Sequence, residues 1–408
     1  MESSPFHEYD RRFVQNGLAA PHQALMGEGG PDAGPDAGPD AGPDAGPDAG
    51  PGIRWSREDA ATAALEPLFD RLGLKALVQL DPAEPYRTII EYLAAQTPLI
   101  CPKDMETRLF LHDLPVVDRP DAGLLEKPLT RRKAVVIPGT GIVTASRKGL
   151  KEAFVTAASV CFACFIKFFG DMRNACKAGT ITAEQRARVQ SLHPLTQPPA
   201  ALPRPLARGP LDTETRLLSA IDEAGKALVD LKLVDSCFGN ISYSKDDTLY
   251  ISRTGTFLDE LEGLVTACST AEPPEKYPDA SSELPAHLEI HRQHGSRAIL
   301  HGHPKFSVIL SMDCDRADCP YQGQCYRYCP YERHACGRIP IVSGEVGGGE
   351  YGLCRSVAPA ICSGPGVIVY GHGVFTCDGR DFNGALKRLI EIEHQCFEAY
   401  FKDMEAGA

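Results

Sequence analysis

Apolar residues recur with a helical period in two segments of the C-terminal half of the chain. The first segment runs from Leu217 to Leu231 and follows Asp212, which can cap a helix; the second covers residues 381–404. Shorter elements are expected between them: a half-exposed strand, a short helix, a buried strand and another short helix, at residues 246–255, 281–295, 297–304 and 305–312. The pattern predicts an α/β protein in which helices and strands alternate.

Two strand–turn–strand segments have the same layout although they lie far apart in the chain. Residues 135–143 read VVIPGTGIV and residues 366–375 read GVIVYGHGVF, and a long helix is expected after each. Flanking glycines permit a tight turn. The residue between the two glycines is Thr140 in the first segment and His372 in the second.

A second pair of segments extends this likeness. FLHDLP, at residues 110–115, aligns with ILHGHP, which places His112 against His301 and Leu114 against His303. We interpret the two halves as an internal duplication, in which the first copy keeps the apolar framework but only one of three histidines. The alternative is a chance similarity between short apolar strands.

Two segments rich in proline divide the 408 residues. Five consecutive PDAG units fill residues 31–50 and are expected to be disordered, because they offer little side chain to bury. A second, Pro-rich connection covers residues 193–211. We therefore expect a disordered N-terminal segment, a first folded region, a linker and a second folded region, at residues 1–52, 53–190, 191–211 and 212–404.

Charge and hydropathy exclude several classes of protein. The net charge of -12, without a clustered basic segment, argues against a nucleic-acid partner. The long apolar run Ala153–Phe169 is interrupted by Lys167, so we expect a core helix and no membrane partner. Residues 1–26 contain no secretory signal, and we expect a soluble cytoplasmic protein whose fifteen cysteines are mostly reduced.

Three histidines are the clearest candidates for chemistry. His301 and His303 are two residues apart on a predicted strand, so their side chains point to the same face and can meet one metal ion. His372 can present a third imidazole from its glycine-bracketed turn, and three histidines with an open position are typical of catalytic zinc. His287 and His291, four residues apart on a predicted helix, could bind a metal together but are expected to be structural.

Five motifs of the second region, in this order, resemble the class II aldolase and adducin family, which includes fuculose-phosphate and ribulose-phosphate enzymes. They are FGNIS, LYISRTG, SSE, HGH and GHG, at residues 238–242, 249–255, 281–283, 301–303 and 371–373. The resemblance implies a three-layer αβα class II aldolase-like fold with a central mixed or antiparallel sheet. The first region would then be a degenerate partial copy of that fold.

The resemblance also implies a role for each site residue. The zinc ligands would be His301, His303 and His372, and Glu283 would be the catalytic acid/base, its pKa raised by burial beside the metal. A substrate phosphate would be held by Asn240, Thr254, Gly255, Ser281 and Ser282. The implied protein is a homo-oligomeric lyase (aldolase) that cleaves a small phosphorylated sugar or related polyol through an enediolate stabilised by Zn2+ or another divalent metal.

The chain departs from the family pattern in two places. Arg253 stands where the family usually has proline and could add a phosphate contact. A cysteine-rich segment at residues 313–342 replaces a short connection, so the tyrosine that assists some family aldolases is not assigned among Tyr321, Tyr326, Tyr328 and Tyr331. Four cysteines there could bind a second zinc or an iron–sulfur cluster, or be free thiols: Cys319, Cys325, Cys329 and Cys336.

Other functions are compatible with the same residues. An epimerase or a dehydratase on this scaffold would share the metal and differ in its proton-transfer residues. A non-catalytic adducin-like interaction module would be expected to lack the three histidines, which are all present. A metal or redox sensor built on the cysteines would be impaired by Cys325→Ser and not by Glu283→Gln.

Overall fold

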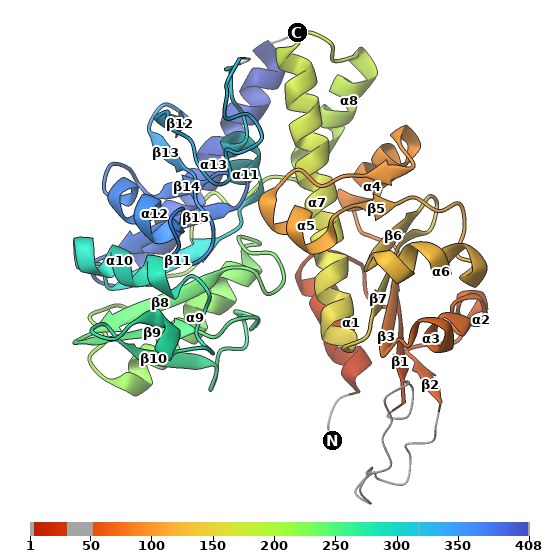
Figure 1. Ribbon diagram of the computed structural model, residues 1–408, viewed down its shortest axis with the longest axis horizontal. Coiled ribbons are helices and arrows are strands. Elements are labelled where there is room, and N and C mark those ends of the chain that lie inside the picture. The colour runs from red at the N-terminus through yellow and green to blue at the C-terminus, as the bar shows by residue number, and fades with distance from the viewer. Residues whose placement is uncertain (1–3, 31–51, 317, 407–408) are drawn as a thin grey trace, which may run out of the picture. The chain divides into compact units, whose positions relative to one another are not determined.

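The computed structural model describes residues 4–30, 52–316 and 318–406, which form two compact units (Figure 1). The N-terminal unit ends at Phe168, and the C-terminal unit follows it. The short segment Asp104–Glu106 belongs to the C-terminal unit. The predicted disorder of the PDAG units lies outside the described residues.

An eight-stranded sheet forms the centre of the C-terminal unit, in the order β10-β9-β8-β11-β15-β14-β13-β12. Neighbouring strands are antiparallel except β13 and β14, which are parallel, so the sheet is mixed. The strands are β8 Asn240–Lys245, β9 Thr248–Ser252, β10 Val265–Ser269, β11 Ala298–Gly302, β12 Arg333–Ala335, β13 Ile339–Val342, β14 Val367–Val369 and β15 Gly373–Asp378. The helices are α8 Ala183–Leu192, α9 Glu214–Asp230, α10 Leu284–His294, α11 Lys305–Ser311, α12 Leu353–Ile361 and α13 Phe382–Ala406, with single 3-10 turns at His193–Leu195 and Pro274–Lys276.

Helices cover both faces of this sheet, because successive side chains of a strand point in opposite directions. Phe375 of β15 is buried in one apolar cluster with residues of α10 and α12. Its neighbour Thr376 points to the other face and donates a hydrogen bond to the carbonyl oxygen of Ala385 in α13, at 2.9 Å. The predicted three-layer αβα arrangement with a central mixed sheet is therefore confirmed for this unit.

Two boundaries differ from the sequence prediction. Helix α9 is capped by Thr213 rather than Asp212, because the Thr213 hydroxyl accepts the Arg216 N–H. The Pro-rich segment 191–211 is not where the two units divide. Its backbone is bound to the C-terminal unit, with the Gly209 N–H donating to Asp381 at 2.9 Å, while the chain passes between units within helix α7.

A five-stranded sheet in the order β2-β1-β3-β7-β6, antiparallel throughout, forms the centre of the N-terminal unit. Its strands are β1 Ala24–Gly29, β2 Ile53–Trp55, β3 Ala76–Leu80, β6 Ala134–Ile137 and β7 Gly141–Ser146, and a separate pair consists of β4 Leu99–Ile100 and β5 Leu114–Pro115. The helices are α1 Pro5–Gln15, α2 Ala60–Leu65, α3 Pro67–Leu72, α4 Tyr86–Gln96, α5 Met105–Leu111, α6 Ala122–Arg131 and α7 Leu150–Lys177. The first two residues of α5 and the part of α7 after Phe168 belong to the C-terminal unit.

The expectation of disorder throughout residues 1–52 is wrong for residues 4–30. Helix α1 buries Tyr9 and Phe13, and strand β1 pairs along its length with β3. The sequence prediction missed α1 because a short helix with few apolar residues has a weak periodic signal.

The two units have the same order of strands in part of their sheets. The run β2-β1-β3-β7-β6 corresponds to β9-β8-β11-β15-β14, and the long helices α7 and α13 follow β7 and β15. In both units a strand threonine donates to a helix carbonyl, from Thr144 to Ala153 at 3.0 Å and from Thr376 to Ala385 at 2.9 Å. The correspondence thus extends from the order of the strands to their hydrogen-bond register.

This register corrects one of the sequence alignments. Gln79 of β3 pairs with Val143 of β7, and His301 of β11 pairs with Phe375 of β15. Val143 and Phe375 each directly precede the threonine that the two units share, so Gln79, not His112, is the counterpart of His301. FLHDLP is not a central strand: its first two residues end helix α5, and its last two form β5. Short apolar runs do not distinguish a strand from a buried helix end. The alignment of Thr140 with His372 agrees with the register.

Helix α7 is long and apolar enough to cross a membrane by length and composition, with a mean hydropathy of 1.8 over its most apolar window. Of that window, 89% is buried inside the protein. The sequence analysis expected a core helix there, and this burial agrees with it.

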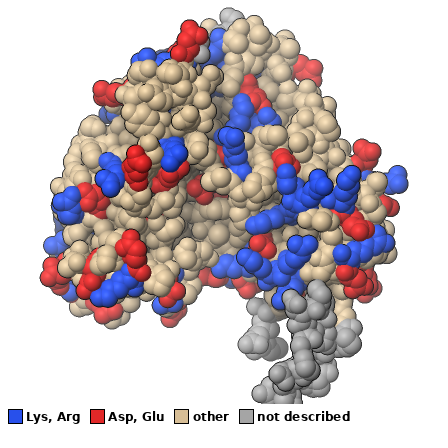
Figure 2. All heavy atoms as spheres, viewed as in Figure 1, with Lys and Arg blue, Asp and Glu red and all other residues tan. Residues whose placement is uncertain are grey.

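Charged residues of both signs are interspersed on the visible face of the C-terminal unit. Figure 2 shows lysines and arginines beside aspartates and glutamates around α10 and strands β8–β10. The net charge of -12 is therefore not gathered into one acidic area on that part of the surface.

Candidate functional site

Three imidazoles converge near the end of β11 in the C-terminal unit. His301 lies on β11, His303 follows that strand, and His372 lies in the turn between β14 and β15. Their ligand nitrogens all lie within 4.8 Å of one another, and all three side chains are buried. Nε2 of His301 and Nε2 of His303 are 3.0 Å apart. The fold thus brings together the three histidines that the sequence analysis singled out.

The glycines around His372 have a steric reason. A Cβ atom at Gly373 would lie 2.4 Å from the carbonyl oxygen of Gly302 and 2.7 Å from Cε1 of His301, so a larger residue would force the strands apart. Gly371 has a φ of 59°, in the left-handed region that glycine adopts without strain. Together they allow the turn to carry His372 up to the other two rings.

Burial favours the neutral form, which a metal ligand needs, in His301 and His303. His301 Nδ1 lies 3.2 Å from the carbonyl oxygen of Val374; donation from Nδ1 leaves the lone pair of Nε2 facing His303. Burial holds the pKa of His301 and of His303 well below the ordinary histidine range, and neighbouring histidines lower both further. Neutral imidazoles with available lone pairs fit Zn2+ or a similar divalent ion.

Glu283 lies at the N-cap position of α10 with its carboxylate against this cluster. Oε1 is 3.3 Å from His372 Nε2, and Oε2 is 3.4 Å from His301 Nε2. Burial raises the pKa of Glu283, while His372 and a hydrogen bond from Asn240 oppose that rise. The direction agrees with the raised pKa expected from the sequence.

A directed chain of buried hydrogen bonds holds Glu283 in place. Asn240 Nδ2 donates to Glu283 Oε2 at 2.7 Å. Asn240 Oδ1 can only accept, so His287 Nε2 donates to it at 2.5 Å. His287 Nδ1 therefore accepts from the Ser242 hydroxyl at 2.7 Å. Burial lowers the pKa of His287 to about 3, which keeps this ring neutral.

The sequence analysis missed this part of the site. His287 and His291 do not face a common ligand, because His291 Nε2 instead lies 3.1 Å from the Ser244 hydroxyl. Both polar atoms of the Asn240 side chain are engaged, Nδ2 with Glu283 and Oδ1 with His287, so this amide positions Glu283. The available signal was the spacing of Glu283 and His287, four residues apart at the start of α10.

A cavity of about 240 Å³ opens over the histidines, Asn240 and Glu283. Its other wall carries most of the predicted phosphate-binding residues and the basic residue beside them: Arg253, Thr254, Gly255, Ser281 and Ser282. The metal-ligating and the polar halves of the candidate site therefore line one cavity, large enough for a small phosphorylated molecule.

Residues 219–400 match the family model described as Class II Aldolase and Adducin N-terminal domain. We refer to residues 219–400 as the aldolase and adducin domain after this match. The domain includes the three histidines, Glu283 and the whole hydrogen-bond chain behind it, while the N-terminal unit lies outside the match. A search of curated proteins found no match.

Several solved structures are similar to the aldolase and adducin domain. L-fuculose-1-phosphate aldolase from Thermus thermophilus is 24% identical, with 46% of this chain and 93% of that chain covered and a TM-score of 0.35. A sugar-phosphate aldolase from Thermotoga maritima is 17% identical, with 48% and 97% covered and a TM-score of 0.35. L-fuculose 1-phosphate aldolase from Glaciozyma antarctica is 17% identical, with 48% and 77% covered and a TM-score of 0.34.

A second carboxylate reaches the histidines from outside the aldolase and adducin domain. Glu106 belongs to the C-terminal unit, and its Oε1 lies 3.1 Å from His372 Nε2. Glu106 also lines the 240 Å³ cavity. No local motif marks this residue in the sequence, because its place depends on how a distant segment folds.

The cysteine-rich segment does not provide a second metal site in the described parts of the chain. There, the three histidines are the only group of three or more His, Cys, Asp or Glu ligand atoms close enough to hold one ion. The free thiol of Cys336 instead donates to the carbonyl oxygen of Gln395 at 3.5 Å and makes a hydrogen bond with the thiol of Cys396 in α13. Two other thiols donate to backbone oxygens, Cys325 to Tyr321 and Cys329 to Tyr331, each at 3.7 Å. Cys319 likewise belongs to no such group.

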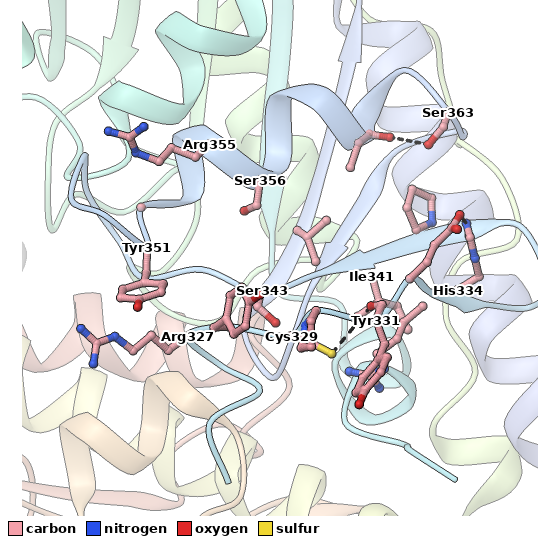
Figure 3. A pocket seen from close by; sticks show the side chains of 18 of the residues that line it. Arg327, Cys329, Tyr331, His334, Ile341, Ser343, Tyr351, Arg355, Ser356 and Ser363 are labelled. Atoms are coloured by element: carbon pink, nitrogen blue, oxygen red, sulfur yellow. Dashed lines mark hydrogen bonds and ion pairs between the residues drawn. The ribbon is translucent and has the colours of Figure 1, made fainter. Parts of the chain in front are cut away.

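A larger cavity, of about 460 Å³, lies beside this cysteine-rich segment (Figure 3). Figure 3 shows Arg327 next to Tyr351, and the guanidinium carbon lies 4.3 Å from the centre of the ring. Cys329 lines this cavity, whereas the three histidines and Glu283 do not. The candidate metal ligands thus line the smaller cavity and not the larger one.

Proposed function

We propose that the C-terminal unit is a metal-dependent lyase that cleaves a carbon–carbon bond in a small phosphorylated sugar or related polyol. The observation that carries this proposal is the convergence of three buried imidazoles with the carboxylate of Glu283 inside one cavity. Membership of residues 219–400 in the class II aldolase and adducin family supports it.

The metal would be held by His301, His303 and His372. When bound, a divalent ion would offset the negative charge that develops on substrate oxygen as the bond breaks. His301 is oriented for this by the Val374 carbonyl oxygen, since donation from Nδ1 leaves the Nε2 lone pair of that ring for the ion. An all-imidazole donor set suits Zn2+ and other borderline divalent ions.

Glu283 would transfer the proton. Burial raises its pKa, which favours the protonated form, so Glu283 can give a proton to the carbon released by cleavage and regain one from solvent. Asn240 and His287 keep the carboxyl group from rotating, since each makes a directed hydrogen bond in a buried position. Because the carboxyl group is already held in place, less conformational entropy is lost when it reaches the reactive geometry.

The polar wall of the cavity would bind the phosphate. Thr254 and Ser282 are exposed to solvent beside Arg253, which supplies a positive charge, whereas Ser281 is more deeply buried. Hydroxyls and a guanidinium group can surround a phosphate. Asn240 lines the same cavity, and its Nδ2 has a second N–H besides the one donated to Glu283, so it keeps its predicted phosphate contact in this proposal.

Proton exchange tests this proposal and separates it from its rivals. The full chain, loaded with Zn2+, is incubated in D2O with a panel of phosphorylated hydroxyketones and sugars and followed by nuclear magnetic resonance. Wild type is expected to exchange the proton next to the carbonyl and to release an aldehyde; Glu283→Gln should lose both while keeping its metal. Epimer formation without aldehyde would indicate an epimerase, and loss of water a dehydratase. No reaction with any compound would leave the interaction module as the better account.

We also propose that the N-terminal unit is a copy of the same fold that binds no metal. Its strand order and register support this, and the positions that correspond to the three histidines carry Gln79, Asp81 and Thr140. One carboxylate, one amide and one hydroxyl are a poor donor set for zinc. A full-length chain should therefore bind one ion at its histidine site rather than two.

A further inference from the structure

Glu106 ends the short segment Asp104–Glu106, which belongs to the C-terminal unit. Contacts of the preceding residue, Met105, hold this segment next to the histidine site. The backbone N–H of Met105 donates to the carbonyl oxygen of Gly371 at 2.7 Å. Met105 also packs on the same turn, since a Cβ atom at Gly371 would lie 3.3 Å from Met105 Cγ. The residue that precedes Glu106 is thus bonded to the residue that precedes His372.

The distances around His372 match those between two ligands of one ion. Nε2 lies 3.1 Å from Glu106 Oε1 and 3.3 Å from Glu283 Oε1. Two ligand atoms about 2.0–2.1 Å from a tetrahedral Zn2+ are separated by about 3.3–3.4 Å. Both carboxylates are therefore close enough to reach an ion that His372 binds through Nε2.

The two carboxylates differ in what else holds them. Glu283 accepts from Asn240, whose own orientation is set by His287. Among the residues that the structure describes, the side chain of Glu106 has one charged partner, His372, and it is 22% exposed on the cavity wall. Glu283 is thus fixed by protein groups, whereas Glu106 is positioned by its segment and is available to an ion.

We propose that Glu106 is a fourth protein ligand of the divalent ion, which leaves Glu283 for proton transfer. This inference rests on the metal-dependent function proposed above. With three neutral imidazoles alone the bound ion would keep its full double charge in a buried site, and one carboxylate halves that charge. The ligand would come from outside residues 219–400, so the aldolase and adducin domain would depend on the preceding half of the chain to complete its metal site.

Metal affinity and the spectrum of bound Co2+ test this ligand directly in the full chain. Wild type is compared with Glu106→Gln, with Glu106→Ser and with Glu398→Gln. Glu398 is the matched control, because its Oε1 lies 3.2 Å from His394 Nε2 on the exposed side of α13, away from the three histidines. Zn2+ affinity is measured by competition with a chromophoric chelator, and folding of each metal-free variant by its thermal midpoint.

Both Glu106 variants are expected to bind Zn2+ at least about tenfold more weakly and to change the visible absorption of bound Co2+. Glu398→Gln should leave both properties unchanged. The inference would be overturned if both Glu106 variants bound Zn2+ within twofold of the wild-type affinity and kept the wild-type Co2+ spectrum. Weaker Zn2+ binding with an unchanged Co2+ spectrum would also overturn it, because Glu106 would then be a hydrogen-bond partner of His372 and not a ligand. If His372→Ala also binds metal like wild type, the histidine site fails, and with it the proposed function.

Discussion

Replacing His287 by leucine tests the buried hydrogen-bond chain behind Glu283, the proposed proton donor. The imidazole is fully buried and is the donor to Asn240 Oδ1 and the acceptor of the Ser242 hydroxyl. Leucine has a similar volume and no polar atom. The substitution therefore removes two hydrogen bonds and leaves two buried polar atoms without their partner, while it opens little space.

The structure sets the size of the expected effect. Asn240 is 5% exposed and Ser242 is fully buried, so water cannot readily replace the imidazole. Each buried polar group left without a partner costs about 1–3 kcal/mol, which gives a loss of about 2–6 kcal/mol in the stability of the C-terminal unit. Since Asn240 would no longer be held, we also expect Glu283-dependent proton exchange to fall by about tenfold or more, equivalent to about 1.4 kcal/mol.

The assay compares His287→Leu with His291→Leu. His291 lies one turn further along α10 and is bonded to Ser244 and to the Ser296 carbonyl oxygen, but it has no link to Glu283 and is partly exposed. Urea unfolding of the C-terminal unit and deuterium exchange into the substrate are measured for both. The reasoning predicts a large loss in both measurements for His287→Leu, and a smaller loss of stability with normal exchange for His291→Leu. Equal stability of His287→Leu and wild type, or equal exchange rates in the two variants, would refute it.

Two further substitutions test other parts of the C-terminal unit. Burial raises the pKa of Asp235 to about 7 from 3.8, so the folded state holds a proton that the unfolded chain releases, and stability should fall as pH rises between these values. This pH-dependent loss of stability is worth at most about 4 kcal/mol, and Asp235→Asn should remove it. Thermal melts of chelator-treated wild type and variant are compared at pH 4.5 and pH 8; a variant whose melting temperature changes between the two pH values as much as that of wild type would contradict this prediction. Gly225 of α9 packs against Leu258, where a Cβ atom would lie 2.0 Å from the carbonyl oxygen, so Gly225→Ala should cost at least about 1–3 kcal/mol in urea unfolding. An alanine variant as stable as wild type would show that the two segments can separate freely.

The features that the sequence predicted correctly are those that a short stretch of chain determines. The turn that carries His372 is bracketed by glycines for local steric reasons, and the HGH motif ends a strand whose apolar residues are recognisable by themselves. The strand pairing then brings His301 and His303 to that turn. The three histidines could therefore be predicted to lie together from local motifs, without knowledge of the complete fold.

The features that were missed depend on contacts between distant segments. Glu106 reaches His372 only because the Met105 N–H pairs with the Gly371 carbonyl oxygen, and no periodicity signals such a bond. His287 appears as an ordinary helix residue until β8 places Asn240 beside it. FLHDLP was read as a strand because six residues are too few to separate a helix end from a strand.

The metal content of the purified full chain tests the central claim most directly. Wild type and His372→Ala are saturated with Zn2+, freed of excess metal and analysed for zinc per chain. The account predicts about one ion per wild-type chain and none retained by His372→Ala, with both proteins folded. Equal zinc in the two proteins would contradict the histidine site, and two ions per wild-type chain would contradict a metal-free N-terminal unit.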